Sequence, residues 1–341
     1  MIIVMQSGTP TDQIQAVEER LAELGYQVNP IYGVEKTVIG AVGGMEHEKI
    51  DAIDSLRSYP GVEDVLLITK PYKFVSREYQ KSKTTIDVRG VVIGGDEVVM
   101  MAGPCTVESR EQLFTTAEAV SKAGARILRG GAYKPSTSPY SFQGMGEPGL
   151  ALLKEAAEKY DMRVITEVMD PRKVELVSSY ADILQIGTRN MQNYDLLKEV
   201  GQTKVPVMLK RGMSAKIEEW LLAAEYVMSG GNPNVMLCER GIRTFEPSVR
   251  NMLDLAAIPL LHKLTHLPVI VDPSQGTGRR DLVETMSVAA VAAGADGLIV
   301  EVHPNPDHAI KDGSQSQTIP QYEAMVTKLA RVATAVDRRL A

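Results

Sequence analysis

Side chains able to bind anions, metals or protons recur at the ends of short apolar runs in this 341-residue chain. After residue 95, eight such runs resemble β-strands, and each is followed by a stretch with helical periodicity. In a closed parallel β/α barrel the carboxyl ends of the strands meet at one face, where active sites are built. The residues at these ends are Cys105, Arg129, Lys134, Glu167, Arg189, Lys210, Arg240, Gln275, Glu301 and His303. The pattern indicates an enzyme.

Positively charged residues are prominent in this set, which contains Arg129, Lys134, Arg189, Lys210 and Arg240. Such a cluster repels itself unless anions are bound. Arginine suits the bidentate capture of phosphate or carboxylate, and lysine adds a point charge that can also donate a proton. A surface ion pair could account for any one of these arginines. It is a weaker explanation for five basic residues that all lie at strand ends. The predicted substrates are small molecules with more than one anionic group.

Cys105, Glu301 and Asp312 form a candidate metal set, because a thiolate and carboxylates can hold a divalent transition ion and leave a position open. His303 lies two residues after Glu301, so both side chains would point to the same side of a strand. His303 is either a further ligand or a hydrogen-bonded core histidine. Glu167 is either an ion-pair partner of the basic residues or a group that positions a water molecule.

The strand-like runs predict a (β/α)8 barrel over residues 97–341, with a doubly wound open sheet as the alternative. Both faces of such strands are buried, which explains why they lack strict alternation. The predicted strands are 97–102, 126–129, 163–167, 182–186, 206–210, 234–238, 268–272 and 297–302.

Residues 1–70 predict a separate α+β domain in the β-α-β-β-α-β order of ferredoxin-like folds, with its second helix over residues 47–61. The domain contains no cluster of catalytic groups. We expect residues 71–96 to form a linker and a hairpin that closes the bottom of the barrel.

Composition argues against several classes of partner. A net charge of -6 and a pI near 5.6 disfavour a protein that coats nucleic acid or an anionic membrane. The sequence lacks an apolar run long enough to span a membrane and a recognisable secretion leader, so we expect a cytoplasmic protein. In that reducing compartment Cys105 and Cys238 should stay unpaired, with Cys238 a small buried apolar side chain.

The motifs AGPC, LRGGAYKPST, IGTRNMQN, LKRGM, LCERGIRTFE and VEVHP occur in this order. With them the chain resembles the 3-deoxy-D-arabino-heptulosonate 7-phosphate (DAHP) synthases, in the form with an N-terminal ferredoxin-like regulatory domain. The resemblance implies a transferase of the shikimate pathway that condenses phosphoenolpyruvate with erythrose 4-phosphate and releases phosphate. It also implies a divalent metal (Mn, Fe, Co, Zn or Mg), an aromatic amino acid as feedback ligand, and a homo-oligomer, either a dimer or a tetramer.

The resemblance also implies residue roles. Phosphoenolpyruvate would be bound by Arg129, Lys134, Arg189, Lys210 and Arg240. Erythrose 4-phosphate would be bound by Lys134, Pro135, Ser136 and Thr137. Metal binding is assigned to Cys105, Glu301 and Asp312, and we expect Lys134, Glu167 and Lys210 to be the catalytic residues. Some members of the family have arginine where Ser136 stands.

Gln275 departs from the family at the metal site. The usual fourth ligand is a histidine in a D-x-S-H motif, and here the sequence reads Asp272-Pro273-Ser274-Gln275. A neutral amide is a poorer donor than imidazole toward transition ions, whether it binds directly or through water. We therefore expect weaker metal binding than in the rest of the family.

Two other functions fit parts of the pattern. A 3-deoxy-D-manno-octulosonate 8-phosphate synthase would share much of the phosphoenolpyruvate site but use arabinose 5-phosphate. Its aldehyde loop usually reads Lys-Ala-Asn-Arg, where this chain has Lys134-Pro135-Ser136-Thr137. A non-catalytic regulatory paralogue is motivated by the missing histidine, although the anion-binding set is otherwise complete.

Overall fold

The computed structural model describes residues 1–32, 36–43, 52–53, 55–66, 71–136 and 138–341, and these form two compact units, Met1–Pro71 and Tyr72–Ala341. In the first unit an antiparallel sheet has the strand order β2-β3-β1-β4, with one long helix, α1, between the first two strands of the chain. The elements are β1 (Ile2–Met5), α1 (Thr11–Glu23), β2 (Gln27–Tyr32), β3 (Thr37–Val42) and β4 (Val62–Leu66). Part of the predicted second helix lies outside the described residues, and 52–53 and 55–57 within it are helical.

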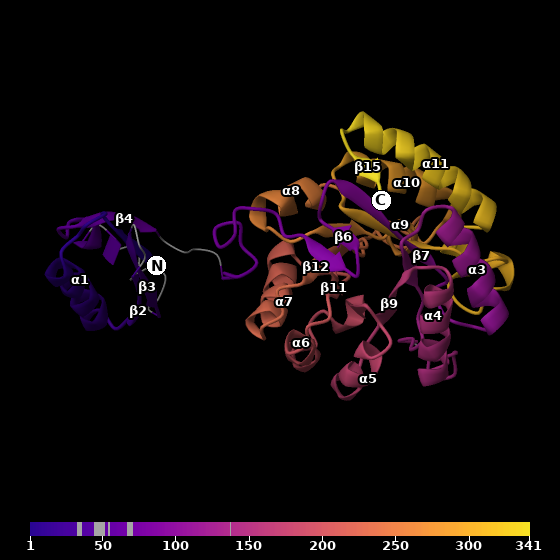
Figure 1. Cartoon of the computed structure of the whole chain (residues 1–341), viewed down its shortest axis with the longest axis horizontal. Coiled ribbons are helices and arrows are strands. Elements are labelled where there is room, and N and C mark those ends of the chain that lie inside the picture. The colour runs from indigo at the N-terminus through magenta and orange to yellow at the C-terminus, as the bar shows by residue number, and fades with distance from the viewer. Residues whose placement is uncertain (33–35, 44–51, 54, 67–70, 137) are drawn as a thin grey trace. The chain divides into compact units, whose positions relative to one another are not determined.

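The second unit is a closed parallel barrel, which confirms the predicted fold class and excludes the open sheet (Figure 1). Each strand pairs with the next along the chain, and β14 pairs with β7 to close the ring. The strands are β7 (Glu97–Gly103), β8 (Ile127–Arg129), β9 (Arg163–Glu167), β10 (Ile183–Ile186), β11 (Val207–Lys210), β12 (Val235–Glu239), β13 (Val269–Val271) and β14 (Gly297–Glu301).

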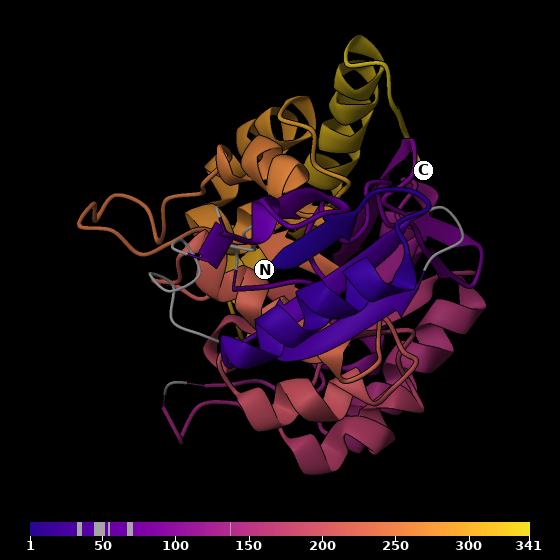
Figure 2. The same ribbon diagram turned by 90° about the vertical axis from the view of Figure 1, so that its left-hand side faces the viewer.

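Helices follow every barrel strand and cover its outer face. They are α3 (Arg110–Lys122), α4 (Glu147–Lys159), α5 (Val174–Ser178), α6 (Tyr194–Gly201), α7 (Ile217–Ser229), α8 (Ala257–Leu264), the short α9 (Pro273–Thr277) with α10 (Arg280–Ala292), and α11 (Ile319–Ala335). The last helix, yellow in Figures 1 and 2, packs beside α10. After it, β15 (Arg339–Leu340) pairs with β7. Among the described residues no helix combines the length and apolar character that a membrane crossing requires.

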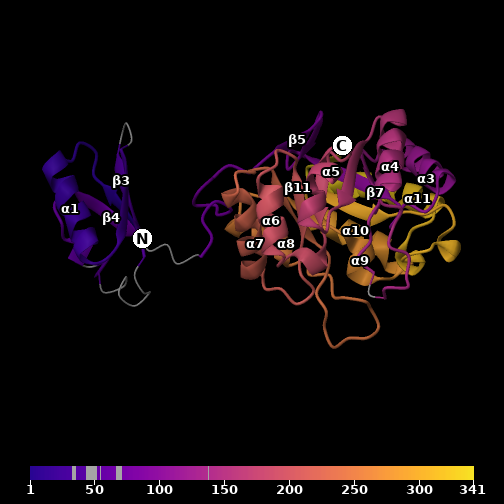
Figure 3. The same cartoon turned by 90° about the horizontal axis from the view of Figure 1, so that it is seen from below.

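The hairpin of β5 (Ile86–Val88) and β6 (Val91–Ile93) closes one end of the barrel. Its buried residues belong to the same apolar cluster as the inward-facing side chains of the barrel strands, including Cys238, which is unpaired and fully buried. Figure 3 shows the hairpin at one end of the barrel and the long loop after β12 at the other. The hairpin of β5 and β6 thus plugs one end of the barrel. The carboxyl ends of the barrel strands lie at the opposite end, where the long loops are.

We expect the packing of the β5–β6 hairpin against the barrel strands to contribute a large part of the stability of the barrel. Ile93 is fully buried in the plug, whereas its neighbour Val92 is 45% exposed. We expect Ile93→Ala to lower the free energy of unfolding of the barrel by about 2–5 kcal/mol and Val92→Ala by less than about 0.5 kcal/mol. Urea titrations of both variants measure this difference. Equal, small effects would mean that the hairpin does not support the barrel.

Candidate active site

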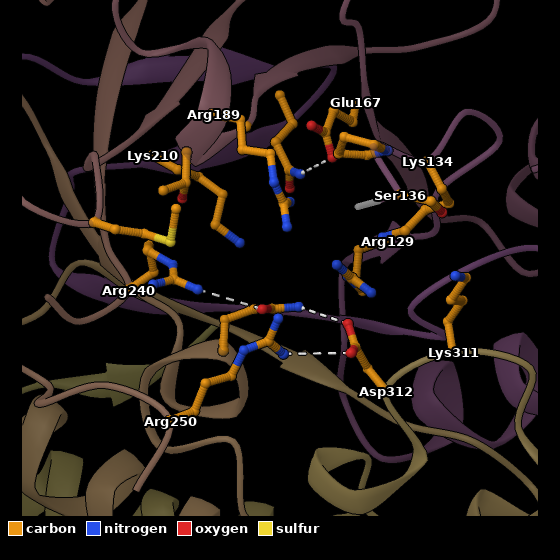
Figure 4. Close-up of a pocket in the computed structure, with 16 residues that line it drawn as sticks. Arg129, Lys134, Ser136, Glu167, Arg189, Lys210, Arg240, Arg250, Lys311 and Asp312 are labelled. Carbon is orange, nitrogen blue, oxygen red and sulfur yellow. Dashed lines mark hydrogen bonds and ion pairs between the residues drawn. The ribbon is translucent and has the colours of Figure 1, made fainter. Parts of the chain in front are cut away.

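A polar pocket of about 180 Å³ lies where the barrel strands end (Figure 4). Arg129, Glu167 and Lys210 are the last residues of β8, β9 and β11, and Arg240 follows β12 directly. Its lining residues are Arg129, Lys134, Pro135, Ser136, Glu167, Gln185, Gly187, Thr188, Arg189, Lys210, Met213, Arg240, Arg250, Gln275, Lys311 and Asp312. The structure thus brings together most of the residues that the sequence singles out.

Positive charge dominates this pocket. Seven lining residues are basic (Arg129, Lys134, Arg189, Lys210, Arg240, Arg250 and Lys311), and two, Glu167 and Asp312, are acidic. Burial lowers the pKa of Arg240, and Asp272 opposes this effect by favouring the charged guanidinium. Buried, poorly hydrated guanidinium groups bind phosphate or carboxylate more strongly than exposed ones do.

Buried carboxylates hold some of these cations in place. Lys210 is buried and makes a short contact with Asp272, which is itself buried. Arg129 Nη1 donates to the carbonyl oxygen of Pro104 over 2.7 Å and lies 3.4 Å from Glu301 Oε1. The Nε atoms of Arg129 and Arg240 have no hydrogen-bond partner among the described residues. Both arginines line the pocket, so guanidinium N–H groups other than these buried Nε atoms are placed to bind a ligand.

Cys105, Glu301 and Asp312 meet beside the pocket, with one potential ligand atom from each lying within 4.8 Å of the others. Burial raises the pKa of the Cys105 thiol far above its usual value, and the charge of Glu301 adds to the effect. The thiol accordingly donates to Asp312 Oδ2 over 3.2 Å. Asp312 has a φ of 52°, a backbone conformation that is uncommon outside glycine and often found at functional sites.

These residues fit a divalent metal by donor type, because a thiolate with two carboxylates suits a transition ion. Burial opposes ionisation of Asp312, but the Arg250 charge and hydrogen bonds from Cys105 and Gln275 outweigh it and lower the pKa of Asp312. Gln275 lies beside the set, as its place in the motif predicts. Its amide nitrogen, rather than its oxygen, faces Glu301 and Asp312, at 3.0 and 3.2 Å.

Lys134 links the metal set to the anion pocket. Its Nζ lies 3.2 Å from both the carbonyl oxygen and the Sγ of Cys105. Burial favours the neutral amine, but Cys105, Glu167 and Glu301 outweigh burial and raise the pKa of Lys134. A Cβ at Gly131 would lie 2.4 Å from Lys134 Cδ, so glycine there leaves room for the lysine. The amine is therefore held as a proton donor in the pocket.

Glu167 lies against β10, close to Lys134. Its Oε2 accepts from Gln185 Nε2 over 3.4 Å, and its Oε1 has no hydrogen-bond partner among the described residues. A Cβ at Gly187 would lie only 2.0 Å from that Oε1, so the carboxylate can occupy this position because residue 187 is glycine. A buried carboxylate with unused acceptor capacity can bind a water molecule or accept its proton.

The other predicted residues lie in different surroundings. Ser136 lines the pocket and donates to the carbonyl oxygen of Phe142 over 2.8 Å, and Thr137 lies outside the described residues. His303 is not among the lining residues: its Nδ1 accepts from the amide of Asn305, so its Nε2 carries the hydrogen and faces Glu108 at 3.2 Å. These contacts are those of a hydrogen-bonded core histidine, one of its two predicted roles.

Arg250 and Lys311 are pocket residues that the sequence analysis missed. Both lie in loops, outside the strand ends on which the prediction relied. Arg250 Nη1 lies 3.3 Å from Asp312 Oδ1 and 2.9 Å from Gln315 Oε1. Lys311 could have been predicted to lie near the site, because it directly precedes the predicted metal ligand Asp312.

Comparison with known proteins places this geometry in a family. The model of the DAHP synthetase I family matches residues 77–338, and that of the DAHP synthase ferredoxin-like domain matches residues 1–70. A phospho-2-dehydro-3-deoxyheptonate aldolase of Thermotoga maritima is 47% identical over 98% of both chains. A 2-dehydro-3-deoxyphosphooctonate aldolase of Syntrophobacter fumaroxidans is 32% identical over 71% of this chain and 90% of its own.

Solved structures agree with this result. The crystal structure of the Thermotoga maritima aldolase, also named DAHP synthase, matches with a TM-score of 0.80 at 46% identity, covering 100% of this chain and 99% of that one. A truncated form of the Thermotoga maritima DAHP synthase matches with a TM-score of 0.75 at 47% identity, covering 79% of this chain and 99% of its own. With both of its units matched in order, the chain belongs to the DAHP synthetase I family, in the form with a ferredoxin-like domain before the barrel.

Proposed function

We propose that the pocket condenses phosphoenolpyruvate with erythrose 4-phosphate to give DAHP and phosphate, the first step of aromatic biosynthesis. The observation that carries this proposal is the concentration of seven basic residues around one pocket next to Cys105, Glu301 and Asp312. The two substrates together carry two phosphates and a carboxylate, and a cluster of positive charge is suited to bind them. The 47% identity to the Thermotoga maritima enzyme over nearly the whole chain supports the same reaction.

In this assignment the phosphoenolpyruvate anion lies among Arg129, Lys134, Arg189, Lys210 and Arg240. The aldose phosphate enters on the side of Lys134, Pro135 and Ser136, where Lys311 adds a positive charge (Figure 4). Holding the two reactants in one orientation provides much of the rate enhancement, because it makes their reaction effectively intramolecular.

The bond changes follow from this placement. C3 of phosphoenolpyruvate attacks the aldehyde carbon, and Lys134 Nζ donates a proton to the aldehyde oxygen as it becomes an alkoxide. Water then adds at C2, and the carboxylate of Glu167, which lines the pocket, takes its proton. Cleavage of the bond between C2 and the phosphate oxygen releases phosphate, which takes the proton of the new C2 hydroxyl group, and leaves a ketone. A divalent ion held by Cys105, Glu301 and Asp312 would add Lewis-acid stabilisation at the aldehyde oxygen.

The choice of aldose phosphate tests the proposed reaction. We expect phosphate release from phosphoenolpyruvate with erythrose 4-phosphate and much less with arabinose 5-phosphate, because the octonate aldolase is only 32% identical over 71% of this chain, against 47% over 98% for the heptonate aldolase. Phosphate release should be followed with each aldose phosphate, with and without added Mn²⁺. Faster turnover with arabinose 5-phosphate would assign the octulosonate reaction, and no turnover with either substrate would leave a non-catalytic protein.

Arg189 provides a residue-level test, because its side chain is exposed and lines the pocket. Loss of a charge-assisted hydrogen bond costs about 1.5–3 kcal/mol, so Arg189→Ala should lower kcat/KM by about 10- to 100-fold. Arg172→Ala is a matched control, since Arg172 is exposed, pairs with Asp170 and does not line the pocket. Steady-state kinetics compare the two variants. An Arg189→Ala enzyme with unchanged kinetics would remove this residue from the site.

The ferredoxin-like unit is proposed to be regulatory, binding tyrosine or phenylalanine between such units in a homo-oligomer. Its edge strand β2 exposes Ile31 and Tyr32, which are 67% and 64% accessible, so this edge has apolar surface available for another copy. Regulation then requires that the amino acid bind two arrangements of the units with different affinity.

Removing residues 1–70 tests this regulatory role. The remaining barrel should keep its activity, because every residue that lines the pocket lies within Tyr72–Ala341, and it should no longer be inhibited by aromatic amino acids. Initial rates of full-length and truncated enzyme at increasing tyrosine and phenylalanine provide the comparison. Inhibition that persists after truncation would place the regulatory site in the barrel, and a full-length enzyme insensitive to both would end the proposal.

A further inference from the structure

The side chain of Gln275 lies between Arg240 and two candidate metal ligands (Figure 4). Its backbone is held on both sides: its N–H donates to Asp272 Oδ1 over 2.8 Å, and its carbonyl oxygen accepts from Asn251 Nδ2 over 2.9 Å. A change of partners at Gln275 is therefore a rotation of its side chain.

The neighbours of the amide agree on one orientation. Its oxygen accepts from Arg240 Nη2 over 3.4 Å, and its nitrogen donates to Glu301 Oε1 and Asp312 Oδ2. Turning the amide over would set donor against donor at Arg240 and an oxygen against two carboxylates. Arg240 thus helps to keep the nitrogen on the side of the metal ligands.

In this orientation Gln275 opposes a metal. An amide nitrogen carries two hydrogens and offers no ligand to a cation, whereas the amide oxygen can. The two carboxylates also have other donors, because Gln315 Nε2 donates to Glu301 Oε2 over 2.7 Å and Arg250 lies 3.3 Å from Asp312 Oδ1. The protein's own donors therefore occupy acceptor positions that a cation would use.

We propose that Gln275 is a latch that couples anion binding at Arg240 to metal binding at Cys105, Glu301 and Asp312. While Arg240 holds the amide oxygen, the amide nitrogen blocks the metal. When the phosphate of phosphoenolpyruvate takes the donors of Arg240, the amide is released, and its oxygen can turn toward a divalent ion. This inference rests on the proposed function, which places phosphoenolpyruvate at Arg240.

The coupling has a direction and a measurable size. Because linkage is reciprocal, phosphoenolpyruvate should raise metal affinity by the same factor by which the metal raises phosphoenolpyruvate affinity. We expect wild-type protein to bind Mn²⁺ about 10-fold more tightly with saturating phosphoenolpyruvate than without it. Without the aldose phosphate the substrate is not consumed, so binding can be measured at equilibrium.

Free Mn²⁺ can be quantified by electron paramagnetic resonance while full-length protein is titrated, with and without phosphoenolpyruvate. A protein-free titration corrects for direct contact between the two. Gln275→Leu keeps a similar size but can neither accept from Arg240 nor donate to the carboxylates, and Gln275→His offers an imidazole ligand. Electrostatic attraction between the bound anion and Mn²⁺ is common to all three proteins, so it cancels when their gains are compared.

We expect both variants to show at least about a 5-fold smaller phosphoenolpyruvate-linked gain than wild type, with Gln275→His binding Mn²⁺ more tightly than wild type when phosphoenolpyruvate is absent. Equal gains in all three proteins would overturn the latch, even if the wild type remains an active synthase. Calorimetric titration of phosphoenolpyruvate alone separates the two proposals. If the wild type does not bind it, the proposed function fails together with the latch.

Discussion

Repulsion between like charges is the constraint on which the pocket depends. Two unit charges 4 Å apart interact with about 4 kcal/mol at an effective dielectric constant of about 20, so a cluster of seven basic residues must be offset. Part of the offset comes from Asp272, which contacts Lys210, and from Glu301, which lies beside Arg129. The positive charge that these carboxylates leave unbalanced is available to attract anionic ligands. A phosphorylated substrate therefore neutralises a charge that the fold itself has concentrated.

Only a rigid scaffold can maintain such a cluster. Closure of β14 onto β7 and the hairpin of β5 and β6 fill the barrel, so the strand ends have little freedom to spread apart. The pocket also depends on close contacts, as at Gly187, where a Cβ would collide with Glu167. Glu167 Oε1, which no described residue hydrogen-bonds, and the left-handed backbone of Asp312 both cost stability, and the rigid scaffold maintains them.

The sequence predicted the barrel well because its signals are local. Strands buried on both faces appear as short apolar runs, and the eight observed strands begin and end within one residue of the predicted bounds. The residues at those ends, such as Arg129 and Lys210, follow from topology alone. Arg250 and Lys311 could not be placed in this way, because loops that bring them to the pocket have no periodic pattern.

The orientation of Gln275 also lay beyond sequence reasoning. Its position in the motif predicted that it would lie near Glu301 and Asp312, but which end of the amide faces them depends on Arg240 and the carboxylates together. The oxygen and nitrogen ends of an amide have nearly the same shape and differ in accepting or donating hydrogen bonds. The neighbouring donors and acceptors therefore determine which way the amide points. In this orientation Gln275 presents a hydrogen-bond donor, rather than a metal ligand, to Glu301 and Asp312.

The basic pocket should bind phosphoenolpyruvate at the ends of β8 to β12. A crystal structure of the full-length protein with phosphoenolpyruvate is the most direct test. We expect the phosphate and carboxylate of the substrate to contact Lys210 and Arg240, with Arg189 beside them. Phosphoenolpyruvate bound elsewhere on the barrel, with no contact to Lys210 or Arg240, would show that this pocket is not its binding site.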